Sequence, residues 1–104
     1  MPDTLLSRFL RYVQIDTQSH GGNGSTPSTP GQWNLLRLLE RELHELGAQD
    51  VVLTEHGYVI ATIPATSDKP GVPTVAFLAH VDTAPDFPGQ NAKPLVHRKW
   101  NGRP

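Results

Sequence analysis

The sequence contains no cysteine, which excludes disulfides and thiolate metal ligands and suits a reducing compartment. It also lacks a basic excess: nine Lys and Arg face ten Asp and Glu, for a formal net charge of −1. Nucleic-acid binding is therefore not indicated, because phosphate recognition requires a basic patch. No run approaches the roughly 20 apolar residues that span a bilayer. The opening residues, Met1-Pro2-Asp3-Thr4, carry no secretory signal. We expect a soluble, cytoplasmic protein without nucleic-acid or membrane partners.

Two amphipathic helices are predicted in the first half of the chain. Apolar residues at helical spacing predict a short helix over residues 3–14. A second helix is expected to begin with Thr29 as N-cap, Pro30 at the first helical position and Gln32 closing a capping box. It is expected to end at Gly47, which suits a left-handed cap. Its apolar stripe, which favours core packing over a partner-binding surface, consists of Trp33, Leu36, Leu39, Leu43 and Leu46.

Strand-like runs follow these helices. Residues 51–54 and 58–63 flank Glu55-His56-Gly57, a pattern typical of a hairpin in which Gly57 adopts a positive φ. After a proline-rich breaker, residues 74–81 form a nearly continuous apolar run, which predicts a strand buried on both faces of an α/β sheet. Residues 93–100 are a candidate for one further strand. We therefore predict an α/β fold whose sheet is incomplete within residues 1–104.

His80 and Asp82 lie at the end of the predicted buried strand. Two residues apart on a strand, their side chains are expected to point to the same side. The carboxyl ends of strands in open α/β sheets are frequent ligand sites. A neutral imidazole can bind zinc while a nearby carboxylate fixes its tautomer. The alternative is a hydrogen-bonded histidine at a strand end, beside an aspartate that caps the following turn.

Four segments, in order along the chain, resemble the peptidase T family of tripeptide aminopeptidases. This family is part of a wider group of zinc hydrolases that includes aminoacylases and carboxypeptidases. Residues 79–86, Ala-His-Val-Asp-Thr-Ala-Pro-Asp, resemble its first metal-binding motif. The other similar segments are residues 8–19, 27–32 and 57–65. The resemblance implies that residues 1–104 are the N-terminal portion of a zinc-peptidase catalytic domain.

The resemblance also implies roles for the two motif residues. His80 would bind one zinc of a two-zinc centre, and Asp82 would orient and polarise that imidazole, which makes it the candidate catalytic residue. The remaining ligands, the general base and a second domain linked to dimerisation are expected from segments outside this sequence. No Asp-Asp or Glu-Glu pair occurs in it, and His20, His44, His56 and His97 match no metal motif of the family.

The expected function is zinc-dependent release of the N-terminal residue from tripeptides, with homodimerisation possible only for the complete protein. We expect the 104-residue chain alone to be inactive. Two alternatives remain open. One is another peptidase of the same zinc family, such as a carboxypeptidase, and the other is a non-catalytic truncated protein or interaction module.

Overall fold

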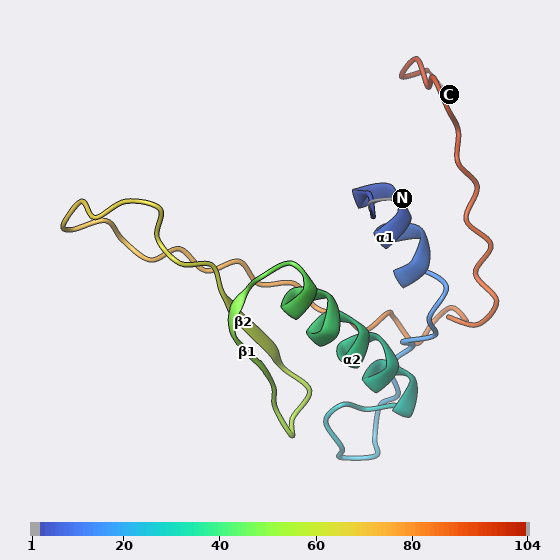
Figure 1. Cartoon of the computed structure of the whole chain (residues 1–104). Coiled ribbons are helices and arrows are strands. Elements are labelled where there is room, and N and C mark those ends of the chain that lie inside the picture. Colours follow the sequence, from blue (N-terminus) through green and yellow to red (C-terminus); the bar gives the residue numbers. More distant parts are fainter. Residues whose placement is uncertain (1–2, 104) are drawn as a thin grey trace.

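The computed structural model describes residues 3–103, so Met1, Pro2 and Pro104 of the predicted 1–104 segment lie outside the described residues. The elements in chain order are α1 (Leu5–Tyr12), α2 (Pro30–Glu45), β1 (Gln49–Leu53) and β2 (Val59–Thr62). Figure 1 shows α2 beside the β1–β2 hairpin and α1 near the N-terminus. The predicted α/β class is confirmed; its assignment to a zinc-peptidase domain stays a prediction.

The first helix forms where it was predicted but is shorter. Thr4 and Ser7 build a capping box at its start, and the helix ends at Tyr12 with Val13 as C-cap. None of its residues is buried, and Leu5 and Phe9 are exposed. The helix is thus amphipathic, as predicted, but its apolar face is only partly covered by other described residues, with Leu10 half-buried.

The start of α2 differs in detail from the prediction. Thr29 is the N-cap and Pro30 opens the helix, but the Thr29 side chain makes no capping hydrogen bond. The capping box was wrong: the Gln32 Oε1 accepts a hydrogen bond from the backbone N–H of Ser28, 3.0 Å away, rather than from that of Thr29. The Gln32 amide therefore reaches one residue further back, into the preceding loop.

The end of α2 is a Schellman motif. Gly47 has φ +81°, as its predicted left-handed role requires. The Gly47 N–H donates to the His44 carbonyl and the Ala48 N–H donates to the Leu43 carbonyl, each at 3.0 Å. Two otherwise unpaired carbonyls are satisfied, and the chain turns directly into β1.

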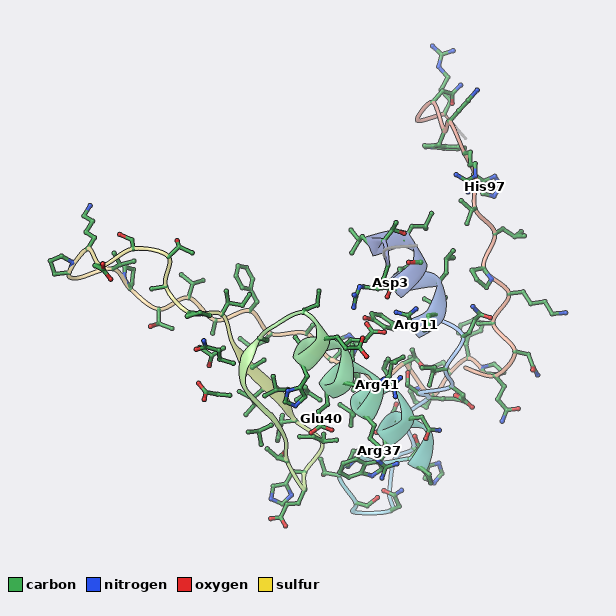
Figure 2. All side chains as sticks on the ribbon, in the orientation of Figure 1. Asp3, Arg11, Arg37, Glu40, Arg41 and His97 are labelled. Atoms are coloured by element: carbon green, nitrogen blue, oxygen red, sulfur yellow. The ribbon has the colours of Figure 1, made fainter. Side chains whose placement is uncertain are left out.

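The core of the described residues is small. Its buried apolar side chains are Leu35 and Leu36, both on α2, the helix that packs on the hairpin. Of the predicted stripe only Leu36 is fully buried, and Leu46 is exposed. The opposite face is polar, as predicted: Figure 2 labels Arg37, Glu40 and Arg41 along it, and Arg37 lies over the Trp33 ring at 5.6 Å.

The predicted hairpin is confirmed. Strands β1 and β2 pair antiparallel, with Val52 opposite Ile60 and Leu53 opposite Val59. Gly57 has φ +78° in the connecting turn. A Cβ at Gly57 would lie 2.8 Å from Cδ of Pro27 and 3.2 Å from Cδ1 of Leu36. The turn therefore needs glycine for two reasons, its backbone conformation and its close packing on α2 and the loop before it.

The predicted buried strand over residues 74–81 was wrong for this chain, as was the candidate strand over 93–100. Neither segment has strand structure, and Phe77 and Leu78 are 96% and 91% exposed. A strand buried on both faces needs neighbours to bond its backbone and layers to cover its side chains. Among residues 3–103, the sheet contains only β1 and β2. It provides neither a neighbouring strand for residues 74–81 nor layers that cover them.

The molecule is consequently extended. Figure 1 shows residues 64–73 as an arm reaching away from the hairpin and the last residues as a second arm. The radius of gyration is 16.9 Å, against about 13 Å for a compact domain of this length. Within residues 3–103, no helix has the length and apolar character needed to cross a membrane.

Candidate functional site

His80 and Asp82 lie in contact, although the segment that carries them is not a strand. The Nδ1 of His80 is 3.1 Å from Oδ1 of Asp82. The His80 side chain is 84% exposed and that of Asp82 is 48% exposed. When Nδ1 carries the ring proton it donates to the carboxylate, which leaves the Nε2 lone pair available to an incoming ligand. The pairing needed to orient the imidazole is therefore present within the segment itself.

The segment is fastened to the protein directly after Asp82. Thr83 forms an isolated parallel bridge with Gln18. The Thr83 N–H donates to the Thr17 carbonyl at 3.1 Å, and the Thr83 carbonyl accepts from the N–H and the Oγ of Ser19, both at 2.9 Å. The Gln18 Nε2 donates to the Pro85 carbonyl at 2.8 Å. Residues 17–19 follow α1, and we call them the strap. They thus hold the segment that carries His80 and Asp82 (Figure 1).

Two cavities flank the same segment. One, of about 550 Å³, is lined by Arg8 and Glu42 as well as His80 and Asp82. The other, of about 540 Å³, is mostly apolar and is lined by α1, α2 and residues 83–92. Residues 79–81 line both cavities. His80 therefore lies between two hollowed surfaces rather than in a closed pocket.

A charge cluster missed by the sequence analysis borders the first cavity. Glu42 on α2 is only 4% exposed. Its carboxylate accepts from Arg8 Nη1 at 2.6 Å, from Arg11 Nη2 at 2.5 Å and from the Tyr12 hydroxyl. Asp3 joins through Arg11, at 2.6 Å, and Figure 2 shows Asp3 and Arg11 close together. The spacing of Arg8, Arg11 and Tyr12, three and four residues apart, is the signal that could have revealed one charged helix face.

This cluster shifts the pKa of both carboxyls. Burial by itself raises the pKa of Glu42, but the hydrogen bonds from Tyr12 and Arg11 and the charges of Arg11 and Arg8 outweigh it, so this pKa is lowered. The hydrogen bond from Arg11, and a second from Ser7, lower the pKa of Asp3 to about 2. Desolvation, together with the hydrogen bond to Glu42, raises the pKa of the Tyr12 hydroxyl. Both acids are thus held ionised as partners of the two arginines.

The residues of this chain do not fit a complete zinc site by themselves. A catalytic zinc ion normally takes three protein ligands. Within residues 3–103, no three His, Cys, Asp or Glu side chains gather to hold a metal. Of the other histidines, His56 lines the 550 Å³ cavity together with His80, and Figure 2 places His97 on the C-terminal arm. His80 can supply one ligand, and further donors would have to come from other polypeptide.

Comparison with known proteins supplies the class. No protein-family model matches the chain. Curated relatives do match over 102 residues, which is 98% of this chain: identity is 48% with a protein of Geobacillus sp. (strain WCH70), 49% with one of Geobacillus thermodenitrificans (strain NG80-2) and 50% with one of Bacillus mycoides (strain KBAB4). The chain is thus similar to peptidases over nearly its whole length.

All three relatives carry the name peptidase T. This confirms the predicted resemblance to the peptidase T family. The chain spans about a quarter of the length of these relatives, 25% of each.

Proposed function

We propose that this chain supplies the His80–Asp82 part of a zinc-dependent aminopeptidase. The observation that carries the proposal is the similarity to peptidase T over 98% of the chain. The 3.1 Å contact between the His80 ring and the Asp82 carboxylate supports it. In this proposal His80 is one ligand in a centre that holds two zinc ions, and Asp82 orients the imidazole. The remaining donors come from sequence equivalent to the other three quarters of the relatives.

The proposed reaction is release of the N-terminal residue from tripeptides in the cytoplasm. Small peptides are the proposed substrates, and homodimerisation belongs to the complete protein. Residues 3–103 contain too few metal donors in one place for this activity, so the 104-residue chain by itself is proposed to be inactive.

The test begins with the gene product isolated from its own cell. Its intact mass, its zinc content by mass spectrometry and its cleavage of tripeptides are measured together. We expect a mass several-fold above 11.4 kDa, bound zinc, and cleavage that requires a free amino terminus. An 11.4 kDa product without zinc or cleavage contradicts the proposal.

Substitution then tests the assignment of the metal ligand. In the isolated product, His80→Ala is expected to remove zinc and cleavage together. His97→Ala is the matched control, because His97 lies on the C-terminal arm away from the candidate site. Retention of zinc by His80→Ala, or its loss from His97→Ala, overturns the assignment of His80.

A carboxypeptidase of the same wider zinc family is the nearest alternative. Tripeptides blocked at one end distinguish the two activities. Acetylation of the amino terminus is expected to abolish cleavage and amidation of the carboxyl terminus to leave it, whereas the reverse pattern indicates a carboxypeptidase.

A non-catalytic interaction module is the second candidate, and one observation favours it. Residues 74–78 combine strand-forming apolar side chains with an exposed backbone that pairs with no strand of residues 3–103. Such a segment can pair with another chain. Binding without zinc or cleavage in the isolated gene product would favour this role.

A further inference from the structure

Gln32 is a buried amide whose hydrogen bonds reach away from its own helix. Its side chain lies in the first turn of α2, and the residue is only 4% exposed. The Nε2 donates to the Thr17 carbonyl at 3.3 Å and to the Ser28 Oγ at 3.1 Å, while Oε1 accepts from the Ser28 N–H. Buried amides are normally satisfied in this way, because an unpaired one is costly.

Through Thr17, Gln32 holds the strap. Thr17 is 3% exposed, so no water competes easily for its carbonyl. That carbonyl also accepts from the Thr83 N–H. A second bond runs in parallel, from the Thr29 Oγ1 to the Gln18 carbonyl at 2.9 Å. The start of α2 is thereby linked to the strap, and the strap to the residue that follows Asp82.

We propose that Gln32 is a positioning residue, which places His80 and Asp82 by holding the strap to α2. Its relevance to catalysis rests on the proposed function, but the hydrogen-bond path from Gln32 through Thr17 to Thr83 does not. The path accounts for a feature of the fold. Residues 74–82 have no strand pairing, yet Thr83 is paired with Gln18 in the strap.

A simpler role for Gln32 is local stabilisation of the helix start through its bond from Ser28. The two roles use different atoms, so one substitution separates them. Gln32→Glu retains an oxygen that can accept from the Ser28 N–H, and a carboxylate is favourable at a helix N-terminus. It cannot donate to the Thr17 carbonyl. The contact between Nε2 and the Ser28 Oγ can be kept with its direction reversed, because the Ser28 hydroxyl can donate to a carboxylate. The Thr17 carbonyl has no proton to donate, so the bond to the strap is lost.

The experiment is NMR on the 104-residue chain without metal or substrate. Amide hydrogen exchange of Ser19 and Thr83, and order parameters of residues 80–83, are measured for the wild type and for Gln32→Glu. Asn34→Asp is the matched control, because it makes the same amide-to-carboxylate change at an exposed position of the same helix. Exchange in the middle of α2 and in the hairpin monitors the rest of the fold.

In the wild type we expect protected Ser19 and Thr83 amides. Gln32→Glu is expected to speed their exchange by about tenfold, as for loss of one hydrogen bond, and to lower the order parameters of residues 80–83 towards values below about 0.6. The α2 and hairpin amides and the Asn34→Asp protein stay as in the wild type. The proposal is overturned if the Thr83 amide of the wild type is unprotected, or if exchange in Gln32→Glu is unchanged. It is also overturned if amides throughout α2 lose as much protection as those of Ser19 and Thr83. Because none of these readouts involves zinc or cleavage, failure of the proposed function leaves this result intact.

Discussion

Glu42 supplies most of the charge pairing that holds the first helix against the second. Its buried carboxylate faces two arginines and a tyrosine hydroxyl from α1, whereas few apolar side chains of α1 are covered. Removing one partner of a buried ionic cluster leaves the other charges unpaired, which costs more than the pair contributes. At the scale of single residues, the attachment of α1 therefore depends on one side chain.

Substitution of Glu42 tests this dependence. Glu42→Gln is expected to lower the free energy of unfolding by about 2 kcal/mol, because Arg8 and Arg11 lose their shared counter-charge. Urea unfolding followed by circular dichroism measures the change. The matched control is Glu45→Gln on the same helix, because Glu45 forms an exposed ion pair with Arg41 at 3.9 Å. Its loss is expected to lower the free energy of unfolding by less than about 0.5 kcal/mol. Equal effects of the two substitutions would contradict the assigned role.

The same carboxyls predict an acid-sensitive fold. Their pKa values are lower in the folded chain, to about 2 for Asp3, so the unfolded chain binds more protons and stability rises with pH. The contribution is present above the ordinary pKa of an acid side chain and is lost as the pH falls through the lowered value. We expect the urea midpoint to fall between about pH 5 and pH 2. The fall should be shallower in Glu42→Gln, and a parallel decline in both proteins would refute this origin.

At the scale of elements, the hairpin turn and α2 depend on each other through Gly57. Gly57→Ala is expected to destabilise the fold by about 1–3 kcal/mol, since it forces a side chain into a positive φ and against Pro27 and Leu36. Thermal unfolding measures the loss. Gly71→Ala separates the two causes, because Gly71 has φ +77° with no atom near its Cβ position. A loss from Gly71→Ala as large as that from Gly57→Ala would show that close packing contributes nothing.

Local signals in the sequence predicted the elements that the structure contains. Pro30 and Gly47 bounded α2, and Glu55-His56-Gly57 located the hairpin turn, because caps and tight turns depend on residues next to one another. The run over residues 74–81 misled for the opposite reason. Its composition suits a buried strand, but burial depends on partners distant in sequence, which residues 3–103 do not provide.

The candidate site likewise combines a local contact with contacts between residues distant in sequence. The contact between His80 and Asp82 is local, and it forms even though the strand on which their two-residue spacing was expected to align them is absent. The strap was not anticipated, because nothing in the pattern of residues 17–19 indicates pairing with Thr83, 64 residues or more away. Gln32 was expected to cap its own helix; its bond to Thr17 depends on how the loop between the helices folds back.

At the scale of the whole molecule, the exposed apolar segment governs behaviour in solution. Phe77 and Leu78 are exposed, and their backbone pairs with no strand of residues 3–103, a combination that favours pairing between chains. We expect the 104-residue chain to self-associate as its concentration rises, and Phe77→Asp to reduce this. Val96→Asp is the control, an exposed apolar residue on the C-terminal arm. Light scattering after gel filtration measures the masses; a monomeric wild type at every concentration, or an equal effect of Val96→Asp, would contradict the expectation.

The bridge between Gln18 and Thr83 also sets an order of events during synthesis on the ribosome. Both helices and the hairpin are complete once Thr62 has been made, whereas the bridge needs Thr83, 21 residues later (83 minus 62). At about 5–20 residues per second, that interval is roughly 1–4 s. The nascent chain therefore presents an assembled helical and hairpin platform before its motif segment has emerged. His80 and Asp82 therefore leave the ribosome after the helices and the hairpin, and the Thr83 bridge that fastens their segment forms later still.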